Sequence, residues 1–199
     1  QWYKRDGDRL EVPVDGYVAD IVRGDMLIEI QTGSFYAIRA KLRELAENHM
    51  LRLVCPLAKD KILVKLPEEG EGESTRRKSP KHCSPFEVFT ELVSMPQLLC
   101  DPSFSLQVLM TTEEEVRRRE PGRAWRRRGW VIEERRLLEV VESHLFETPG
   151  QLGALLPEDL GEPFTTAELA GAAEIRRSLA QKACYCLRNM NVIDHIGMK

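Results

Sequence analysis

The most constraining feature of the sequence is a pair of strand-like runs that flank a turn signal. Residues 12–22 and 27–31 are rich in Val, Ile and Leu, and Gly24-Asp25 lies between them. A Gly-X pair between such runs favours a β-hairpin with a two-residue loop. We therefore expect a hairpin in which Asp20 lies opposite Glu29.

The register of this hairpin decides where its polar side chains lie. Directly opposed residues share one face, with β-carbons roughly 5 Å apart, so Asp20, Glu29 and Gln31 would crowd one face. A four-residue loop keeps this arrangement, whereas a three-residue loop would put the two carboxylates on opposite faces. The apolar residues of the hairpin would fill the other face: Ile21, Ile28 and Ile30.

Two carboxylates held side by side repel each other and are costly to desolvate unless a positive charge lies between them. Mg²⁺ or Mn²⁺ prefers such oxygen ligands and takes water and substrate phosphate as the others. An ion of this kind polarises a phosphodiester and lowers the pKa of a bound water. The alternative is that Asp20 and Glu29 are solvated on the outer face of the hairpin.

The next residues predict a small α/β (α+β) unit. Ser34 can cap a helix over residues 35–49, and apolar runs at 51–55 and 61–66 indicate two more strands. The order of strand, strand, helix, strand, strand describes a mixed sheet with a crossover helix.

This pattern resembles the PD-(D/E)XK (restriction-endonuclease-like) nuclease superfamily over roughly residues 10–66. A strand ending in Asp20, a hairpin, a strand with Glu29-Ile30-Gln31, a helix and a further strand carry the resemblance. It implies Asp20 and Glu29 as ligands of a catalytic Mg²⁺ or Mn²⁺, joined by the backbone carbonyl of Ile30.

Position 31 is where the sequence departs from the superfamily pattern. The superfamily motif has a lysine there, which orients the attacking water and stabilises developing charge. Some active members of the superfamily have Gln at this position, but Gln31 cannot supply a positive charge. Lys41, on the predicted helix, could reach back in its place or be an exposed helix lysine. Glu11 resembles an additional acidic residue of the superfamily. The resemblance thus implies a catalytic set of Asp20, Glu29, Gln31 and Lys41.

The C-terminal region has the outline of a winged helix-turn-helix. A capped helix over residues 163–170, a turn at Ala173-Glu174, a helix over 175–189 and a strand over 191–197 follow one another. Donors on the second helix could reach a DNA duplex; these are Arg176, Arg177, Gln181, Lys182 and Arg188. Segments 27–33 and 52–56 also look similar to bacterial proteins in which a nuclease-like domain precedes such a motif. The motif also serves protein contacts in many chains.

A second basic region lies before it. Residues 117–136 hold nine Arg against three Glu, in a chain with 29 Lys and Arg against 32 Asp and Glu. Trp125 and Trp130 flank its centre, Arg126-Arg127-Arg128, which gives a candidate contact with DNA phosphates. A solvated helix end with both tryptophans in the core is the alternative.

Elements and boundaries follow from the rest of the chain. We expect a loop at 67–85, a short helix at 86–95, a strand at 104–110 and a helix at 131–146. The domains predicted are a nuclease-like domain at 1–110, a basic connector and helix at 111–148, and a winged helix-turn-helix at 149–199. Five scattered cysteines fit a reducing cytosol, and no run of about 20 apolar residues predicts a membrane span.

Together, the residues and the resemblance imply a cytoplasmic, metal-dependent endonuclease-like protein of bacterial type that acts on DNA, expected to be double-stranded, with a homodimer left open. Defence and repair are the settings that the resemblance implies, and the sequence separates neither. One rival is a DNA-binding regulator whose nuclease fold has lost catalysis, for which Gln31 is the main support. The other rival is an interaction scaffold that binds a protein through the helix-turn-helix.

Overall fold

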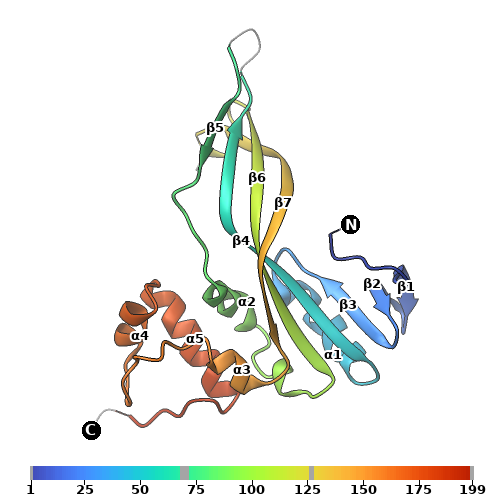
Figure 1. Cartoon of the computed structure of the whole chain (residues 1–199), viewed down its shortest axis with the longest axis vertical. Helices are drawn as coiled ribbons and strands as arrows, with labels where there is room; N and C mark the ends of the chain where they lie inside the picture. Colours follow the sequence, from blue (N-terminus) through green and yellow to red (C-terminus); the bar gives the residue numbers. More distant parts are fainter. Residues whose placement is uncertain (1, 68–71, 126–127, 198–199) are drawn as a thin grey trace. The chain divides into compact units, whose positions relative to one another are not determined.

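The computed structural model describes residues 2–67, 72–125 and 128–197. Within these ranges the chain is a mixed α/β protein with a seven-stranded mixed sheet (Figure 1). The sheet order is β1-β2-β3-β4-β6-β7, with β5 paired to β4. The strands are β1 (Arg9–Val14), β2 (Tyr17–Arg23), β3 (Met26–Ile30), β4 (Met50–Lys65), β5 (Thr75–Lys78), β6 (Phe104–Arg119) and β7 (Trp130–Phe146).

The helices are short. The 3₁₀ helices are η1 (Phe35–Ile38), η2 (Pro85–Val88) and η3 (Leu98–Cys100); the α-helices are α1 (Arg39–Ala46), α2 (Phe89–Leu92), α3 (Pro149–Gly153), α4 (Thr166–Ala172) and α5 (Arg177–Asn189). Among the described residues, no helix combines the length and apolar character needed to cross a bilayer.

The chain divides into two compact units that do not follow chain order. The first unit comprises Gln1–Pro56, Pro85–Val108 and His144–Lys199, and the second comprises Leu57–Ser84 and Leu109–Ser143. Strands β4, β6 and β7 therefore have residues in both units. Compactness does not show whether residues 1–110, 111–148 and 149–199 fold independently, so these three expected domains stay a prediction.

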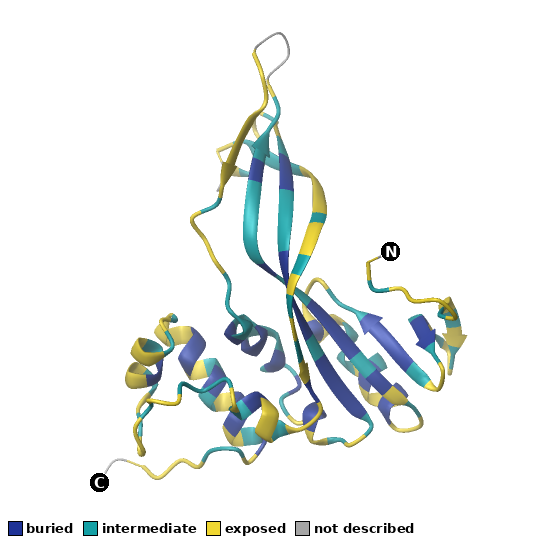
Figure 2. Cartoon of the chain, in the orientation of Figure 1, coloured by how far each residue is buried: buried dark blue, intermediate teal, exposed yellow. Residues whose placement is uncertain are grey.

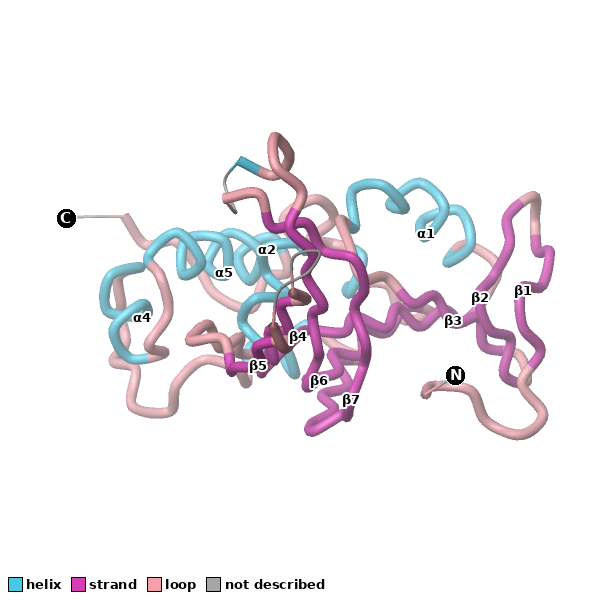
Figure 3. The backbone as a smooth tube through the Cα atoms, turned by 90° about the horizontal axis from the view of Figure 1, so that it is seen from above, coloured by secondary structure: helices cyan, strands magenta, loops and turns pink. Residues whose placement is uncertain are grey.

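In the first unit, the hairpin has the register predicted from the sequence. Strands β2 and β3 are antiparallel, with Arg23 opposite Met26 and Ile21 opposite Ile28. Strand β1 extends this arrangement antiparallel to β2, and the β1–β2 turn interrupts the single run expected over 12–22. Strand β4 lies parallel to β3, so η1 and α1 form the crossover between them (Figure 3). The mixed sheet with a crossover helix is thus confirmed.

The apolar side of the crossover helix packs into the core of the first unit. Phe35, Leu42 and Leu45 have no exposed surface, like Ile28 and Leu53 of the sheet (Figure 2). Ser34 precedes the 3₁₀ helix η1 as expected, but its side chain makes no capping hydrogen bond.

Helices α4 and α5 pack against each other, and α5 also packs against α2. The helix-turn-helix expected here stays a prediction. Leu179 and Leu187 bury one face of α5, and Glu174 adopts a φ of 52° in the turn. The strand expected at 191–197 is wrong, because this segment is a turn followed by irregular chain. Its first amides, of Asn191 and Val192, donate to carbonyls of α5 and close the helix end.

The second unit contains strands where the sequence predicted a helix and a loop. Residues 131–146, expected to be helical, belong to β7; their apolar spacing fits either structure, and pairing within the sheet decides it. The expected loop at 67–85 contains β5, which pairs antiparallel with β4 through Val64 and Arg76. The two strands expected at 51–55 and 61–66 are one strand, β4, and the strand expected at 104–110 continues as β6 to Arg119.

The N-terminus of α4 offers a test of this fold. The Thr165 hydroxyl accepts from the Glu168 amide at 3.2 Å, while the Glu168 carboxylate accepts from the Thr165 amide at 2.6 Å. Thr165→Ala removes half of this capping box and should lower the free energy of unfolding by about 1 kcal/mol. Urea denaturation measures the loss, and the adjacent Thr166→Ala, inside the helix, should cost less. Equal losses would contradict the capping role.

Candidate functional site

Glu29 is a buried acidic side chain in the core of the first unit. It lies on β3 next to the Ile21–Ile28 pair and is 4% exposed. The parallel pairing of β3 with β4 puts Leu53 beside it in the sheet. A carboxylate in such surroundings is costly unless it is paired.

Lys41 supplies the partner from helix α1. Its ammonium donates to Glu29 Oε2 at 2.6 Å and to the backbone carbonyl of Val18 at 2.7 Å. The lysine side chain is itself largely buried. Of the two alternatives left open for Lys41, the structure has the one that reaches back to the hairpin, and the ion pair joins β2, β3 and α1 at one point.

The second oxygen of Glu29 lacks any such contact. Oε1 is buried and, among the described residues, has no hydrogen-bond partner. An unsatisfied buried acceptor costs roughly 1–3 kcal/mol, and more when it is charged. Burial raises the pKa of Glu29 above its ordinary value; the Lys41 ammonium opposes this rise, and the Asp20 carboxylate adds to it.

Asp20 lies beside Glu29 on the neighbouring strand. Its Oδ2 accepts a hydrogen bond from the Ile30 amide at 2.8 Å, which fixes the half-buried carboxylate against β3. The paired residues of the hairpin end at Ile21 and Ile28, one residue short of Asp20 and Glu29. Because the Asp20 carboxylate acts on the pKa of Glu29, the two side chains lie near each other. The contact seen at Ile30 uses its N–H, and the implied role of its carbonyl as a ligand stays a prediction.

Gln31 and Glu11, the other two candidates from the hairpin region, make no hydrogen bond or ion pair with Asp20 or Glu29 in the described structure. The side-chain amide of Gln31 donates from Nε2 to the backbone carbonyl of Ser34 at 3.0 Å, within the loop after β3. Glu11 is exposed in β1, with a φ of 50°. In the described part of the chain, no group of three or more His, Cys, Asp or Glu side chains could hold a metal. Glu11 therefore does not join Asp20 and Glu29 in such a group.

The arginine cluster of the second unit is largely ion-paired. Arg117 contacts Glu115 at 2.6 Å, and Arg136 contacts Glu134 at 2.5 Å. Counting charges over 117–136 missed Glu113–Glu115, which sit just before that window on β6. Further pairs in the cluster are Arg118–Glu120, Arg123–Glu120, Arg135–Glu115 and Arg136–Glu114.

The centre of that cluster is only partly described. Arg126 and Arg127 lie outside the described residues, and Arg128 is exposed with a φ of 52°. Trp125 is 80% exposed and so is not a core residue. The Lys65 ammonium lies 4.4 Å from the centre of the half-buried Trp130 ring.

The predicted DNA-contacting residues of α5 lie mostly on its surface. Arg177, Gln181 and Arg188 are exposed, Lys182 is half-buried, and Arg176 is paired with Glu87 at 3.3 Å. They therefore remain available as donors, with Arg176 the most constrained of the set.

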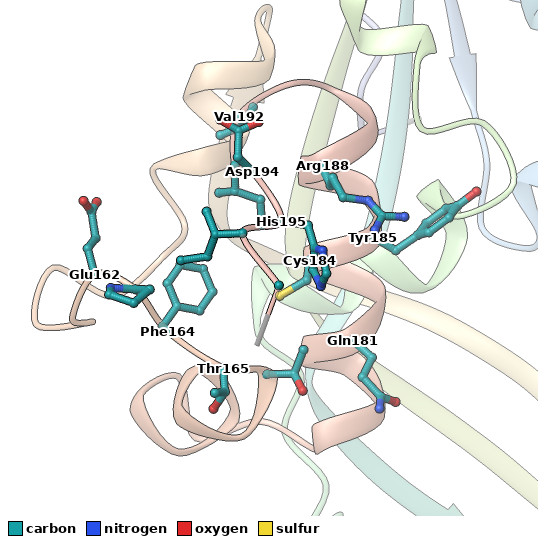
Figure 4. Close-up of a pocket in the computed structure, with 15 residues that line it drawn as sticks. Glu162, Phe164, Thr165, Gln181, Cys184, Tyr185, Arg188, Val192, Asp194 and His195 are labelled. Atoms are coloured by element: carbon teal, nitrogen blue, oxygen red, sulfur yellow. The ribbon is translucent and has the colours of Figure 1, made fainter. Parts of the chain in front are cut away.

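A groove that the sequence did not predict runs along α5. It has a volume of about 950 Å³, with Gln181, Cys184, Tyr185 and Arg188 on its helix side (Figure 4). The residues 162–166 and 192–197 complete it. Burial raises the pKa of the Cys184 thiol, so it is protonated at neutral pH and a poor nucleophile.

Comparison with known proteins places the chain in a family. The model of the family described as "Domain of unknown function (DUF8091)" matches residues 1–147. The chain belongs to this family. The match contains Asp20, Glu29 and Lys41, whereas α3, α4 and α5 lie beyond it.

The remaining comparisons, with a curated relative and with solved structures, assign no function to the chain. The chain is 30% identical over 166 residues to an uncharacterized protein of Treponema pallidum (strain Nichols). The match covers 82% of this chain and 65% of the Treponema protein, so the chain spans less than two thirds of that relative. No solved structure matches the chain.

The Glu29–Lys41 pair predicts a pH-dependent stability. Because the pKa of Glu29 is raised on folding, ionising it costs folding free energy as pH rises through the folded pKa. Lys41→Met removes the group that opposes this rise. We expect it to lose about 3 kcal/mol of unfolding free energy at neutral pH, and much less at a pH below the ordinary pKa of glutamate.

Urea denaturation at the two pH values measures this difference. Glu29→Gln/Lys41→Met should regain much of the lost stability, because no buried charge is left unpaired. Arg43→Met, at an exposed position of the same helix, is the matched control and should change little. A Lys41→Met loss that is the same at both pH values would contradict the account.

Proposed function

We propose that this chain is a metal-dependent nuclease of the PD-(D/E)XK type that hydrolyses phosphodiester bonds in DNA. The observation that carries the proposal is the buried Glu29 Oε1, which has no partner among the described residues and belongs to a carboxylate beside Asp20. An acceptor left open beside a second carboxylate suits a cation that prefers oxygen ligands.

The residues present fit Mg²⁺ or Mn²⁺. Asp20 and Glu29 would hold the ion, and two carboxylates suffice because Mg²⁺ usually keeps several waters and adds substrate phosphate. Bound there, the ion would supply charge to the phosphodiester and lower the pKa of a water. The Ile30 amide donates to the Asp20 carboxylate and so holds it in place on the neighbouring strand.

Lys41 is the residue of this chain best placed for the role of the missing lysine. It already contacts Glu29, whereas Gln31 donates to Ser34 in the loop after β3. A cation within 2.6 Å of a metal-binding carboxylate can orient water and stabilise negative charge on phosphate. Lys41 also keeps the buried Glu29 neutralised as a pair before any metal binds.

The fold supports the same proposal. Strands β1, β2 and β3 run antiparallel in sequence order, and a helical crossover leads to β4 parallel to β3. This is the order on which the resemblance to the superfamily rests. We assign the C-terminal helices α4 and α5 as a helix-turn-helix that holds DNA, without the strand of a wing.

One specific observation favours the regulator as the second candidate. The ammonium of Lys41 already satisfies one oxygen of Glu29, so the pair can exist as a structural ion pair without metal. In that case the nuclease fold would bind DNA without cleaving it, and the missing lysine at position 31 would mark the loss of catalysis.

A cleavage assay separates the two candidates. We expect the full chain to cut double-stranded DNA with Mg²⁺ or Mn²⁺ and not with EDTA. Asp20→Asn and Glu29→Gln should each lower the rate at least about 100-fold, because each removes a charged ligand. The rate should also rise with pH through the raised pKa of Glu29, since only its ionised form binds metal.

Matched controls test whether the charge itself or its position matters. Asp25→Asn and Glu47→Gln change the same residue types at exposed positions and should leave cleavage unchanged. Single-stranded DNA and RNA extend the substrate range. DNA binding without cleavage under every metal condition would favour the regulator, and neither binding nor cleavage would favour the interaction scaffold.

Helix α5 predicts a salt-dependent DNA affinity. Arg177→Ala/Arg188→Ala removes two exposed cations, so it should weaken duplex binding. It should also reduce the slope of log K against log salt by roughly 0.9 per lost phosphate contact. Fluorescence anisotropy over a salt series measures both quantities. Arg43→Ala, an exposed cation on α1, is the control; equal effects from both variants would contradict a DNA-binding role for α5.

A further inference from the structure

Strand β7 is the last strand of the sheet. The sheet order ends at β7, and no strand in the described ranges pairs with its outer side. The 17-residue strand is exposed along much of its length (Figure 2). An open edge presents backbone amides and carbonyls to any other strand, and the part considered for pairing is residues 133–141.

The side chains along this edge are not only protective charges. Leu138 is 37% exposed and Val141 is 39% exposed, among charged neighbours of both signs. Lone charges at a strand edge discourage pairing. Opposite charges favour pairing where the register brings them together, since directly opposed ions interact across a sheet.

Twofold symmetry restricts the registers that two copies of β7 could adopt. Antiparallel copies related by an axis normal to the sheet must oppose residues of the same face, and successive side chains alternate between faces. The axis therefore passes through a pair formed by one residue and its own copy. Each candidate register is then defined by the residue at its centre.

The register centred on Leu137 is the one that the charges favour. It puts Leu137 opposite its copy and Arg135 opposite Glu139 on both sides of the axis. Over residues 133–141 it opposes no two like charges. The remaining opposed pairs are Arg136 with Leu138, Glu134 with Val140, and Glu133 with Val141.

Neighbouring registers bring like charges together. Centring on Arg136 opposes two arginines and also sets Glu133 against Glu139. Centring on Leu138 sets Glu134 against Glu142. Like charges directly opposite one another destabilise a strand pair. Of these three registers, only the one centred on Leu137 opposes Arg135 to Glu139 without opposing like charges.

We propose that the chain forms a homodimer by antiparallel pairing of β7 with β7 of a second copy, in the register centred on Leu137. The occupant is a second copy because the charge pattern of the edge is complementary to itself. Arg135 lies 3.5 Å from Glu115 with its side chain 58% exposed, so its guanidinium can also face a partner. The proposal does not depend on nuclease activity.

Cysteine cross-linking tests the register. In a chain with Cys83, Cys100 and Cys184 changed to Ser, Leu137→Cys should give a disulfide-linked dimer, because opposed Cα atoms lie about 4.5–5.5 Å apart. Val141→Cys, at a similarly apolar position of the strand, should not, since its copy lies far along the partner. Cross-linking at Val141 equal to that at Leu137 would overturn the register.

Analytical ultracentrifugation of charge-reversed variants of the full chain measures how the proposed interface depends on the Arg135–Glu139 pairs. Glu139→Arg puts an arginine opposite Arg135 on each side of the axis. We expect this variant to dimerise at least about tenfold more weakly than the wild type. Arg135→Glu opposes two glutamates and should do the same. An equal mixture of the two variants restores opposite charges at both pairs, so it should form heterodimers.

Circular dichroism on each variant shows whether a variant that no longer dimerises is still folded. Arg135→Glu could unfold the chain, because it puts a second negative charge beside Glu115. If it unfolds, Glu139→Arg and the cross-linking pair decide alone. A wild-type chain that stays monomeric up to about 100 μM, or folded single variants that dimerise as well as the wild type, would overturn the proposal.

Discussion

The ion pair between Lys41 and the buried Glu29 is the interaction on which the first unit depends. It links β3 to α1, and through the Val18 carbonyl it also reaches β2. Each of these elements has an apolar face that packs in the core, but the polar contact fixes how the helix lies over the strands. A buried charge with a single partner makes this arrangement sensitive to pH and to any ligand that competes for the carboxylate.

The geometry of the Glu29–Lys41 pair favours a functional metal site over a purely structural ion pair. A bridge built only for stability would satisfy both oxygens of Glu29, whereas Oε1 stays buried without a partner in the described structure. Asp20 is held against β3 by the Ile30 amide, and its carboxylate adds to the rise of the Glu29 pKa. The protein accepts this repulsion at one point of the sheet, which is typical of functional sites.

The hairpin and its carboxylates could be predicted from the sequence because they depend on local rules. A Gly-Asp turn and the alternation of side chains set the register, and both hold in the structure. For Lys41 the sequence left two alternatives open, an exposed helix lysine and a reach back to the hairpin, and only the structure shows the second. The acidic partners of the arginine cluster were missed because Glu114 and Glu115 meet Arg136 and Arg135 only across the sheet.

Other parts depend on tertiary contacts that a single sequence does not encode locally. The apolar spacing of residues 131–146 fits a helix as well as a strand, and only the place of β7 at the end of the sheet decides between them. The segment after α5 reads as a strand by composition, yet its amides close the helix. The groove along α5 joins residues 162–166 to the C-terminal segment and has no local signature.

The most direct test of the central claim is the position of a bound metal. A crystal of the chain soaked in Mn²⁺ and measured near the manganese absorption edge locates the ion by its anomalous signal. The account predicts a peak in contact with Glu29 Oε1 and the Asp20 carboxylate, with water completing the coordination. Full diffraction data with no peak there, and Lys41 still paired with Glu29, would contradict it.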